Sequence, residues 1–245
     1  MQNNRRGTRL AEIAADIERH GVSVTLVSGG PLPRFAYTIG LRESVGFDLV
    51  MAGASYYTAR EVHAVLNDVA AGLRAGSTAR ALPLPALGQV SLSPADASWS
   101  SALGLGASDF YGVSNPAMAQ VVPDGQHWTI DVPDMTHEWK PGREPIWRWL
   151  RQSWEYGLSP SSVATTNLAA LRGGPITELA RWEDDQWEMF CRPGPDVTPD
   201  DVRVIPLATL LAFDESLLVA VDLPLGEGRW REGLTSEWQD WKRSE

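Results

Sequence analysis

The sequence is poor in several residue types that common catalytic and binding sites require. One cysteine among 245 residues excludes an internal disulfide, and it excludes a zinc site built from several cysteines. Lys and Arg number 21 against 31 Asp and Glu, and the net charge of −10 argues against a nucleic-acid partner, because binding to phosphates requires basic residues. No hydrophobic run approaches the roughly 18 residues of a membrane span, so we expect no membrane association.

The N-terminal segment also lacks the apolar core and the small-residue cleavage site of a secretion signal. It is polar and amphipathic instead, and we therefore expect a cytoplasmic protein. Hydrophobic residues make up 43% of the chain, which is enough to bury a core and excludes general disorder.

Metal, nucleotide and hydrolase motifs are missing as well. No two histidines have the H-x-x-x-H spacing that presents a pair of imidazoles to one metal ion. The chain contains neither a phosphate-binding G-x-x-x-x-G-K-[ST] loop nor a G-x-S-x-G nucleophile turn. We therefore expect no metal and no cofactor, and the sequence favours a protein that is not an enzyme.

The charge and the tryptophans are unevenly distributed. Residues 1–122 contain nine acids and nine bases, whereas residues 123–245 contain 22 acids and 12 bases, so the whole net charge of −10 lies in the second half. Ten of the eleven Trp residues lie there too. Such a change in composition is typical of a chain with two domains.

The hydrophobic pattern predicts an α+β protein. Short apolar runs, several of them alternating, predict strands over 22–27, 35–41 and 48–53, and in the second half over 162–166, 176–182 and 186–191. Thr58 and Glu61 form a T-x-x-E capping box at the start of a helix that ends near Gly76. The Asp124-Gly125 pair predicts a hairpin that joins residues 121–122 to residues 127–130.

We predict two small domains, each with a mainly antiparallel sheet and a few packed helices. They comprise residues 1–133 and residues 161–245. Residues 134–160 are rich in Pro and Trp and are predicted to form a linker with a helix that begins at Pro145. Trp147 and Trp154 are seven residues apart and would share a face of that helix.

An acidic run flanked by aromatic residues is the candidate binding site of the second half. Glu183, Asp184 and Asp185 lie between Trp182 and Trp187, without the D-x-D-x-D-G alternation of a calcium loop. The mismatch with a calcium loop favours a solvated hairpin turn, and a binding site is the alternative. As a binding site, it would use the three acids to steer a basic protein partner and the Trp187 indole to anchor it.

A pocket between the strands of the first half is the second candidate site. Tyr37, Thr38, Tyr111 and His127 offer polar side chains that would converge there. His127 stands out because a carboxylate three or four residues away can orient its ring. No dyad or metal spacing indicates a reaction class for these residues.

Three motifs of the first half resemble a bacterial family, the domain of unknown function numbered 4262. They are Pro33–Leu41 with its FAYTIGL strand, the Phe110-Tyr111-Gly112 loop, and the hairpin Gln120–Gly125. The resemblance covers about residues 8–133. Family members have a G-His-Pro-Glu stretch where this chain has Gly46-Phe47-Asp48, and a Trp where it has Val122.

The second half is similar to another family, the domain of unknown function numbered 2185, and to its immunity-protein relatives. The motifs that carry this resemblance are short and lie within about residues 160–241: residues 184–190, 205–210, 214–217 and 229–232. The resemblance implies a domain of the kind proposed to act as an antitoxin in polymorphic toxin systems.

We therefore expect a non-catalytic cytoplasmic binding protein of the immunity type, whose acidic domain neutralises a basic toxin domain. An alternative is an N-terminal domain that binds a small ligand or catalyses an unidentified reaction. A third is a scaffold subunit whose tryptophan-rich segment 139–154 docks another chain, including a second copy in a homodimer.

Overall fold

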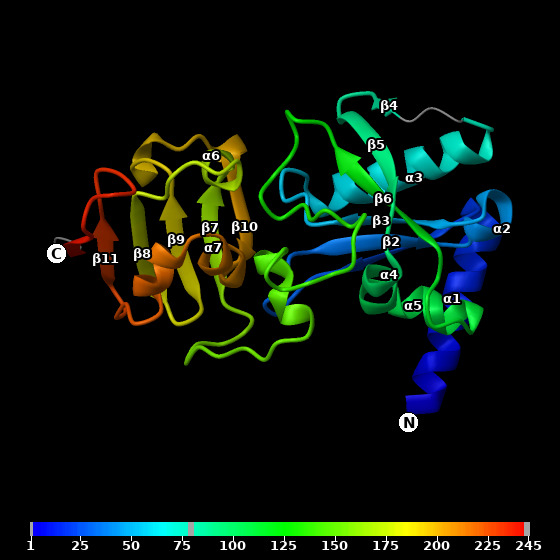
Figure 1. Cartoon of the computed structure of the whole chain (residues 1–245), viewed down its shortest axis with the longest axis horizontal. Helices are drawn as coiled ribbons and strands as arrows, with labels where there is room; N and C mark the ends of the chain where they lie inside the picture. Colours follow the sequence, from blue (N-terminus) through cyan, green and yellow to red (C-terminus); the bar gives the residue numbers. More distant parts are fainter. Residues whose placement is uncertain (1, 78–80, 243–245) are drawn as a thin grey trace. The chain divides into compact units, whose positions relative to one another are not determined.

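The computed structural model describes residues 2–77 and 81–242, which divide into two compact units (Figure 1). The first unit comprises the chain up to Val27 together with residues 34–128 and 134–139. The second comprises residues 28–33 and 129–133 together with the chain from Lys140 onward. Each unit contains a six-stranded, mainly antiparallel sheet with helices, so the predicted α+β class with two domains is confirmed.

The first unit is built on a sheet with the strand order β1-β2-β3-β6-β5-β4. Neighbouring strands are antiparallel except β3 and β6, which are parallel. The strands are β1 (Ser23–Val27), β2 (Phe35–Ile39), β3 (Asp48–Ala52), β4 (Ala81–Leu84), β5 (Gly88–Pro94) and β6 (Met118–Pro123). The helices are α1 (Gln2–His20), α2 (Arg42–Val45), α3 (Ala59–Arg74), α4 (Ala97–Leu103) and α5 (Leu105–Tyr111).

Strands β2 and β3 form the centre of this unit. All five residues of each strand are buried, as expected for strands that are covered on both faces. Helix α3 contacts β1, β2 and β3, and α5 contacts β2; Figure 1 shows α3 on one side of these strands and α4 with α5 on the other. The FAYTIGL motif is therefore a core strand, and its polar side chains must find partners inside the protein.

Helix α3 begins at the predicted capping box. The Thr58 hydroxyl accepts a hydrogen bond from the Glu61 amide at 3.3 Å, and the Glu61 carboxylate accepts one from the Thr58 amide at 2.7 Å. The two bonds satisfy amides that have no partner within the helix. Residues at helical spacing then face the core: Val62, Val65, Leu66, Val69 and Ala70.

The second unit contains a sheet with the order β10-β7-β9-β8-β11-β12. All neighbouring strands are antiparallel except β7 and β9. The strands are β7 (Val163–Asn167), β8 (Glu178–Glu183), β9 (Gln186–Phe190), β10 (Val202–Pro206), β11 (Glu227–Trp230) and β12 (Gln239–Lys242). The helices are α6 (Leu168–Leu171), α7 (Leu207–Phe213) and four 3-10 helices, η1 (Pro145–Leu150), η2 (Gly194–Asp196), η3 (Pro199–Asp201) and η4 (Glu215–Ala220).

The hairpin predicted at Asp124-Gly125 does not form. Residues 127–130, which would be its second strand, are turn and coil. Strand β6 lies between β3, which pairs with residues 118–120, and β5, which pairs with residues 119–123. The Asp124 amide donates to the Gln89 carbonyl at 2.9 Å, which extends the pairing with β5. At residues 121–122, one edge of β6 is therefore already taken by β5 and is not open to a strand that follows Asp124.

The predicted helix after Pro145 is a 3-10 helix that ends at Leu150. Trp147 and Trp154 therefore do not share a helical face. The Trp147 side chain is buried and donates from its indole nitrogen to the Asp131 carbonyl at 2.9 Å, whereas that of Trp154 donates to the Leu158 carbonyl at 2.7 Å. Of the predicted linker, residues 134–139 belong to the first unit and the remainder to the second.

The longest helix of the described chain is α1, with 19 residues. Its apolar residues are interspersed with charged ones, and no helix in residues 2–77 or 81–242 is both long and apolar enough to span a membrane.

The capping box leads to a prediction about stability. Replacing Thr58 with Ala removes the acceptor of the Glu61 amide, and we expect the free energy of unfolding to fall by about 1 kcal/mol. Urea denaturation followed by circular dichroism measures the change. Thr235→Ala is the matched control, because this exposed threonine caps no helix, and its effect should stay within about 0.5 kcal/mol. Equal effects of the two substitutions would contradict the prediction.

Candidate functional site

The structure divides the four residues of the predicted N-terminal pocket among separate places. Thr38 and Tyr111 meet at the buried carboxylate of Asp48. The Tyr37 hydroxyl accepts a hydrogen bond from the Gly106 amide at 3.1 Å, and an added Cβ at residue 106 would lie only 2.4 Å from this hydroxyl. His127 contacts none of these groups and lies beside Asp124, Tyr56 and Tyr57.

Strand pairing explains why His127 is remote from the others. Asp48 pairs with Met118 at the start of β6, whereas His127 follows Pro123 at its end. At about 3.3 Å per residue, the five steps along β6 separate the two positions by ~17 Å. Tyr37, Thr38 and Tyr111 therefore do not form a shared site with His127.

Asp48 is a junction of hydrogen bonds inside the first unit. Its Oδ1 accepts bonds from the Thr38 hydroxyl at 3.1 Å and from the Leu41 amide at 3.0 Å, and its Oδ2 accepts one from the Tyr111 hydroxyl at 2.7 Å. The Tyr111 hydroxyl also accepts a bond from the Gly40 amide at 2.6 Å. One carboxylate thus joins the end of β2, the start of β3 and the end of α5.

The environment of Asp48 favours its neutral form. Burial raises the pKa of this carboxyl, although the bonds from Tyr111, Leu41 and Thr38 act in the opposite direction. The pKa of Tyr111 is also raised, mainly by burial and further by its bond to Asp48. Asp48 was not among the predicted site residues. An acid at the start of the buried run DLVMA was the signal in the sequence that could have identified it.

In the second unit, the predicted acidic residues lie in the turn between β8 and β9. Glu183, Asp184 and Asp185 are all exposed. Trp187, the predicted anchor, is only 1% exposed and donates from its indole nitrogen to the Ala220 carbonyl at 3.1 Å. This corrects the expectation for Trp187: its ring is part of the core and is not available to a partner.

Strand alternation explains why Trp182 faces the side of the sheet opposite to Trp187, because Trp182 follows Arg181, which pairs with Trp187. Arg181 pairs with Trp187 and Glu183 with Gln186, so Trp182 is an extra residue between two paired ones. Its indole nitrogen donates to the Glu188 carboxylate at 2.9 Å, on the face of β9 opposite to Trp187.

Two further tryptophans lie on the same face of the sheet. Glu188 pairs with Ala180, which pairs with Gly228, which in turn pairs with Trp241. The rings of Trp241 and Trp182 are 5.4 Å apart at an angle of 71°. We call this surface the acidic–tryptophan face, defined by the exposed turn and its neighbours on the sheet: Trp182, Glu183, Asp184, Asp185, Glu188, Trp230 and Trp241.

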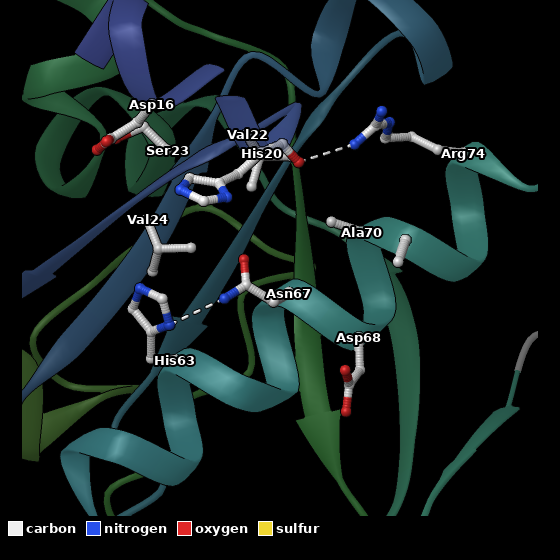
Figure 2. Close-up of a pocket in the computed structure, with 11 residues that line it drawn as sticks. Asp16, His20, Val22, Ser23, Val24, His63, Asn67, Asp68, Ala70 and Arg74 are labelled. Atoms are coloured by element: carbon white, nitrogen blue, oxygen red, sulfur yellow. Dashed lines mark hydrogen bonds between the residues drawn. The ribbon is translucent and has the colours of Figure 1, made fainter. Parts of the chain in front are cut away.

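A cavity of about 510 Å³ lies in the first unit between α1, β1 and α3 (Figure 2). Several of its polar side chains are engaged with each other or with the backbone. Asn67 lies 2.9 Å from His63 Nδ1, and Arg74 donates to the His20 carbonyl at 3.0 Å. Throughout the described ranges, we find no group of three or more His, Cys, Asp or Glu residues arranged to hold a metal ion.

The raised pKa of Asp48 predicts a specific dependence of stability on pH. Because folding favours the neutral carboxyl, the stability of the wild type relative to Asp48→Asn should fall as pH rises from the unfolded value of about 3.9 through the higher folded value. Urea denaturation of both proteins between pH 4 and pH 8 measures the difference, in which the other carboxyls cancel. If the stability of the wild type relative to Asp48→Asn rose with pH, the result would contradict the prediction.

Removing the Asp48 carboxylate altogether should be more damaging. Asp48→Ala leaves the Leu41 amide and the Tyr111 and Thr38 hydroxyls without this acceptor in a buried site. We expect a loss of about 3 kcal/mol in the free energy of unfolding, and a smaller loss for Asp48→Asn, which keeps one acceptor oxygen.

Comparisons with known proteins concern the first unit. Residues 16–128 match the model of a family described as Domain of unknown function (DUF4262), a range that contains Asp48, Tyr111, Asp124 and His127. Among curated proteins and solved structures, nothing matches the chain. None of these findings supports the resemblance of residues 160–241 to immunity-protein families, which stays a prediction. The resemblance of the first half to the domain of unknown function 4262 is confirmed.

Proposed function

We propose that this chain is a cytoplasmic protein whose second unit binds a basic protein partner, without catalysis of its own, through its acidic–tryptophan face. Neutralisation of a basic toxin domain, as by an immunity protein, is the role that this proposal assigns to it. The observation that carries the proposal is the combination of three unpaired carboxylates with exposed tryptophans on one face of a sheet.

The carboxylates at the turn are available for a partner. Within the described residues, Glu183, Asp184 and Asp185 form no ion pair with Lys or Arg; Asp185 only accepts a hydrogen bond from the Ser162 hydroxyl at 3.3 Å. Arg181 is close to this turn, but it donates to the Asp184 backbone carbonyl at 2.8 Å. The turn therefore keeps its negative charge, which accelerates the encounter with a basic surface.

The tryptophans supply the apolar part of the proposed interface. Trp230 is 37% exposed and Trp241 is 39% exposed. Tryptophan is enriched among the residues that dominate binding energy, because its large ring buries much apolar area at little cost in conformational entropy. Exposed indoles beside uncompensated carboxylates fit a partner with cationic and apolar groups.

Several of these side chains are held in place before a partner binds. The Trp182 ring is fixed by its bond to Glu188 and by the ring of Trp241. Trp241 lies over Gly228, where an added Cβ would be 2.5 Å from the ring. Such ordering lowers the entropy cost of association.

The test begins with purification of the tagged full chain from its native host and identification of the co-purifying protein by mass spectrometry. The partner is then produced on its own and titrated by calorimetry. Glu183→Lys/Asp184→Lys/Asp185→Lys should weaken binding about 100-fold, from roughly 1 kcal/mol for each reversed charge. Trp230→Ala should weaken it about 10-fold or more.

The matched control is Asp196→Lys/Asp200→Lys/Glu215→Lys, which changes the net charge equally at exposed residues outside the face. Its affinity should stay within about threefold of the wild type. Equal effects of the two triple variants, or an acidic partner, would refute the proposal. For a toxin partner, co-expression of the wild type should restore growth and the 183–185 variant should not.

A further inference from the structure

The geometry points to a second functional site, in the first unit, where Asp124 and His127 form a carboxylate–imidazole pair whose Nε2 accepts a proton from a bound water. This site is independent of the proposed interface in the second unit. His127 would be the catalytic residue and Asp124 the positioning residue.

The carboxylate of Asp124 is held firmly and faces the imidazole. Its Oδ2 accepts a hydrogen bond from the Gln89 amide at 2.7 Å, and its Oδ1 accepts one from the Gln126 amide at 2.9 Å and lies 2.6 Å from His127 Nδ1. Burial of the carboxyl opposes ionisation, but the bonds from His127, Gln89 and Gln126 prevail and lower the pKa of Asp124. An ionised carboxylate only accepts hydrogen bonds, so the proton between the two groups lies on Nδ1.

The other ring nitrogen is left open. The His127 side chain is 16% exposed, and in the described part of the chain its Nε2 has no hydrogen-bond partner. With the proton fixed on Nδ1, Nε2 presents a lone pair to whatever binds beside it.

Aromatic side chains fix the plane of the imidazole. The Tyr57 ring is nearly parallel to it, at 11° and 5.7 Å, and the Tyr56 ring meets it edge-on at 4.6 Å. Tyr57 is itself buried, and its hydroxyl donates to the Leu87 carbonyl at 2.8 Å. The ring of His127 is thus oriented on several sides while Nε2 remains open.

The backbone beside the ring adopts left-handed conformations, which are unfavourable for the two alanines among its residues. Gly88 has φ of +82°, and a Cβ there would be 2.3 Å from the imidazole. Ala86 and Ala54, in the loops that lead to Gly88 and to Tyr56, have φ of +63° and +60°. A left-handed conformation costs a non-glycine residue about 1 kcal/mol, and such strain often accompanies functional sites.

These features define a simple chemical step. The O–H bond of a bound water breaks, its proton moves to Nε2, and the freed electron pair on oxygen forms a bond to the carbonyl carbon of a bound activated ester. The imidazolium that forms is stabilised by Asp124, as in other carboxylate-oriented imidazole bases. The ester C–O bond then breaks, and the leaving alcohol takes up the proton from Nε2, so the step needs no oxidant. The ligand class is an activated ester that water attacks.

The proton position can be measured directly on the 15N-labelled full chain by long-range proton–nitrogen NMR. We expect His127 to carry its proton on Nδ1 and to have an unprotonated Nε2, and we expect Asp124→Asn to abolish this preference. A purely structural contact would not require an open Nε2. If the proton of wild-type His127 lies on Nε2, the proposal is overturned. This measurement uses the wild type alone, so misfolding of a variant cannot affect it.

Hydrolysis of p-nitrophenyl acetate by the full chain tests the chemistry. His127→Gln should reduce the rate attributable to the protein at least 10-fold, and Asp124→Asn should reduce it nearly as much. The matched controls are His137→Gln and Asp134→Asn, because this second pair, with 3.1 Å between His137 Nδ1 and Asp134, is far more exposed. Equal rates for the His127 and His137 variants, with unchanged unfolding transitions, would refute the proposal.

Discussion

The parallel pairing of β3 with β6 is the constraint on which the first unit depends. Strand β3 pairs with residues 118–120 of β6 and β5 with residues 119–123, so β6 is held between the two strands along its length. The start of β6 lies beside Asp48, and its end delivers Asp124 and His127. The start of β6 thus lies beside a buried acid of β3, and its end leads to an oriented imidazole.

The two acids show how environment determines the role of a carboxyl group. Asp48 is buried, and several neighbouring groups donate hydrogen bonds to its carboxylate. Its raised pKa reflects the cost of keeping a charge in this buried position. Asp124 lies nearer to solvent and receives bonds from backbone amides and an imidazole, so its pKa is lowered. The first acid joins strands and a helix, whereas the second can orient a base.

Much of the fold was predictable because burial imposes regular patterns. The strands around FAYTIGL and DLVMA, the capping box at Thr58 and the acidic turn at 183–185 all follow from local sequence. The hairpin after Asp124 was wrong, since local turn chemistry does not reveal that β5, which precedes β6 in the chain, already pairs with β6 up to Pro123. Trp187 was wrongly placed at the surface, although it alternates with the polar Gln186 and Glu188 and is buried on the same side as Met189.

The sequence by itself determined the α+β class, the division into a neutral and an acidic half, and the pairing of His127 with a nearby acid. Each of these depends on composition or on residues a few positions apart. Only the tertiary structure decided that Asp48, Thr38 and Tyr111 share one buried junction, that Tyr56 and Tyr57 enclose His127, and that Trp241 joins Trp182. These contacts join residues distant in the chain, and strand order and register, which no local pattern encodes, bring them together.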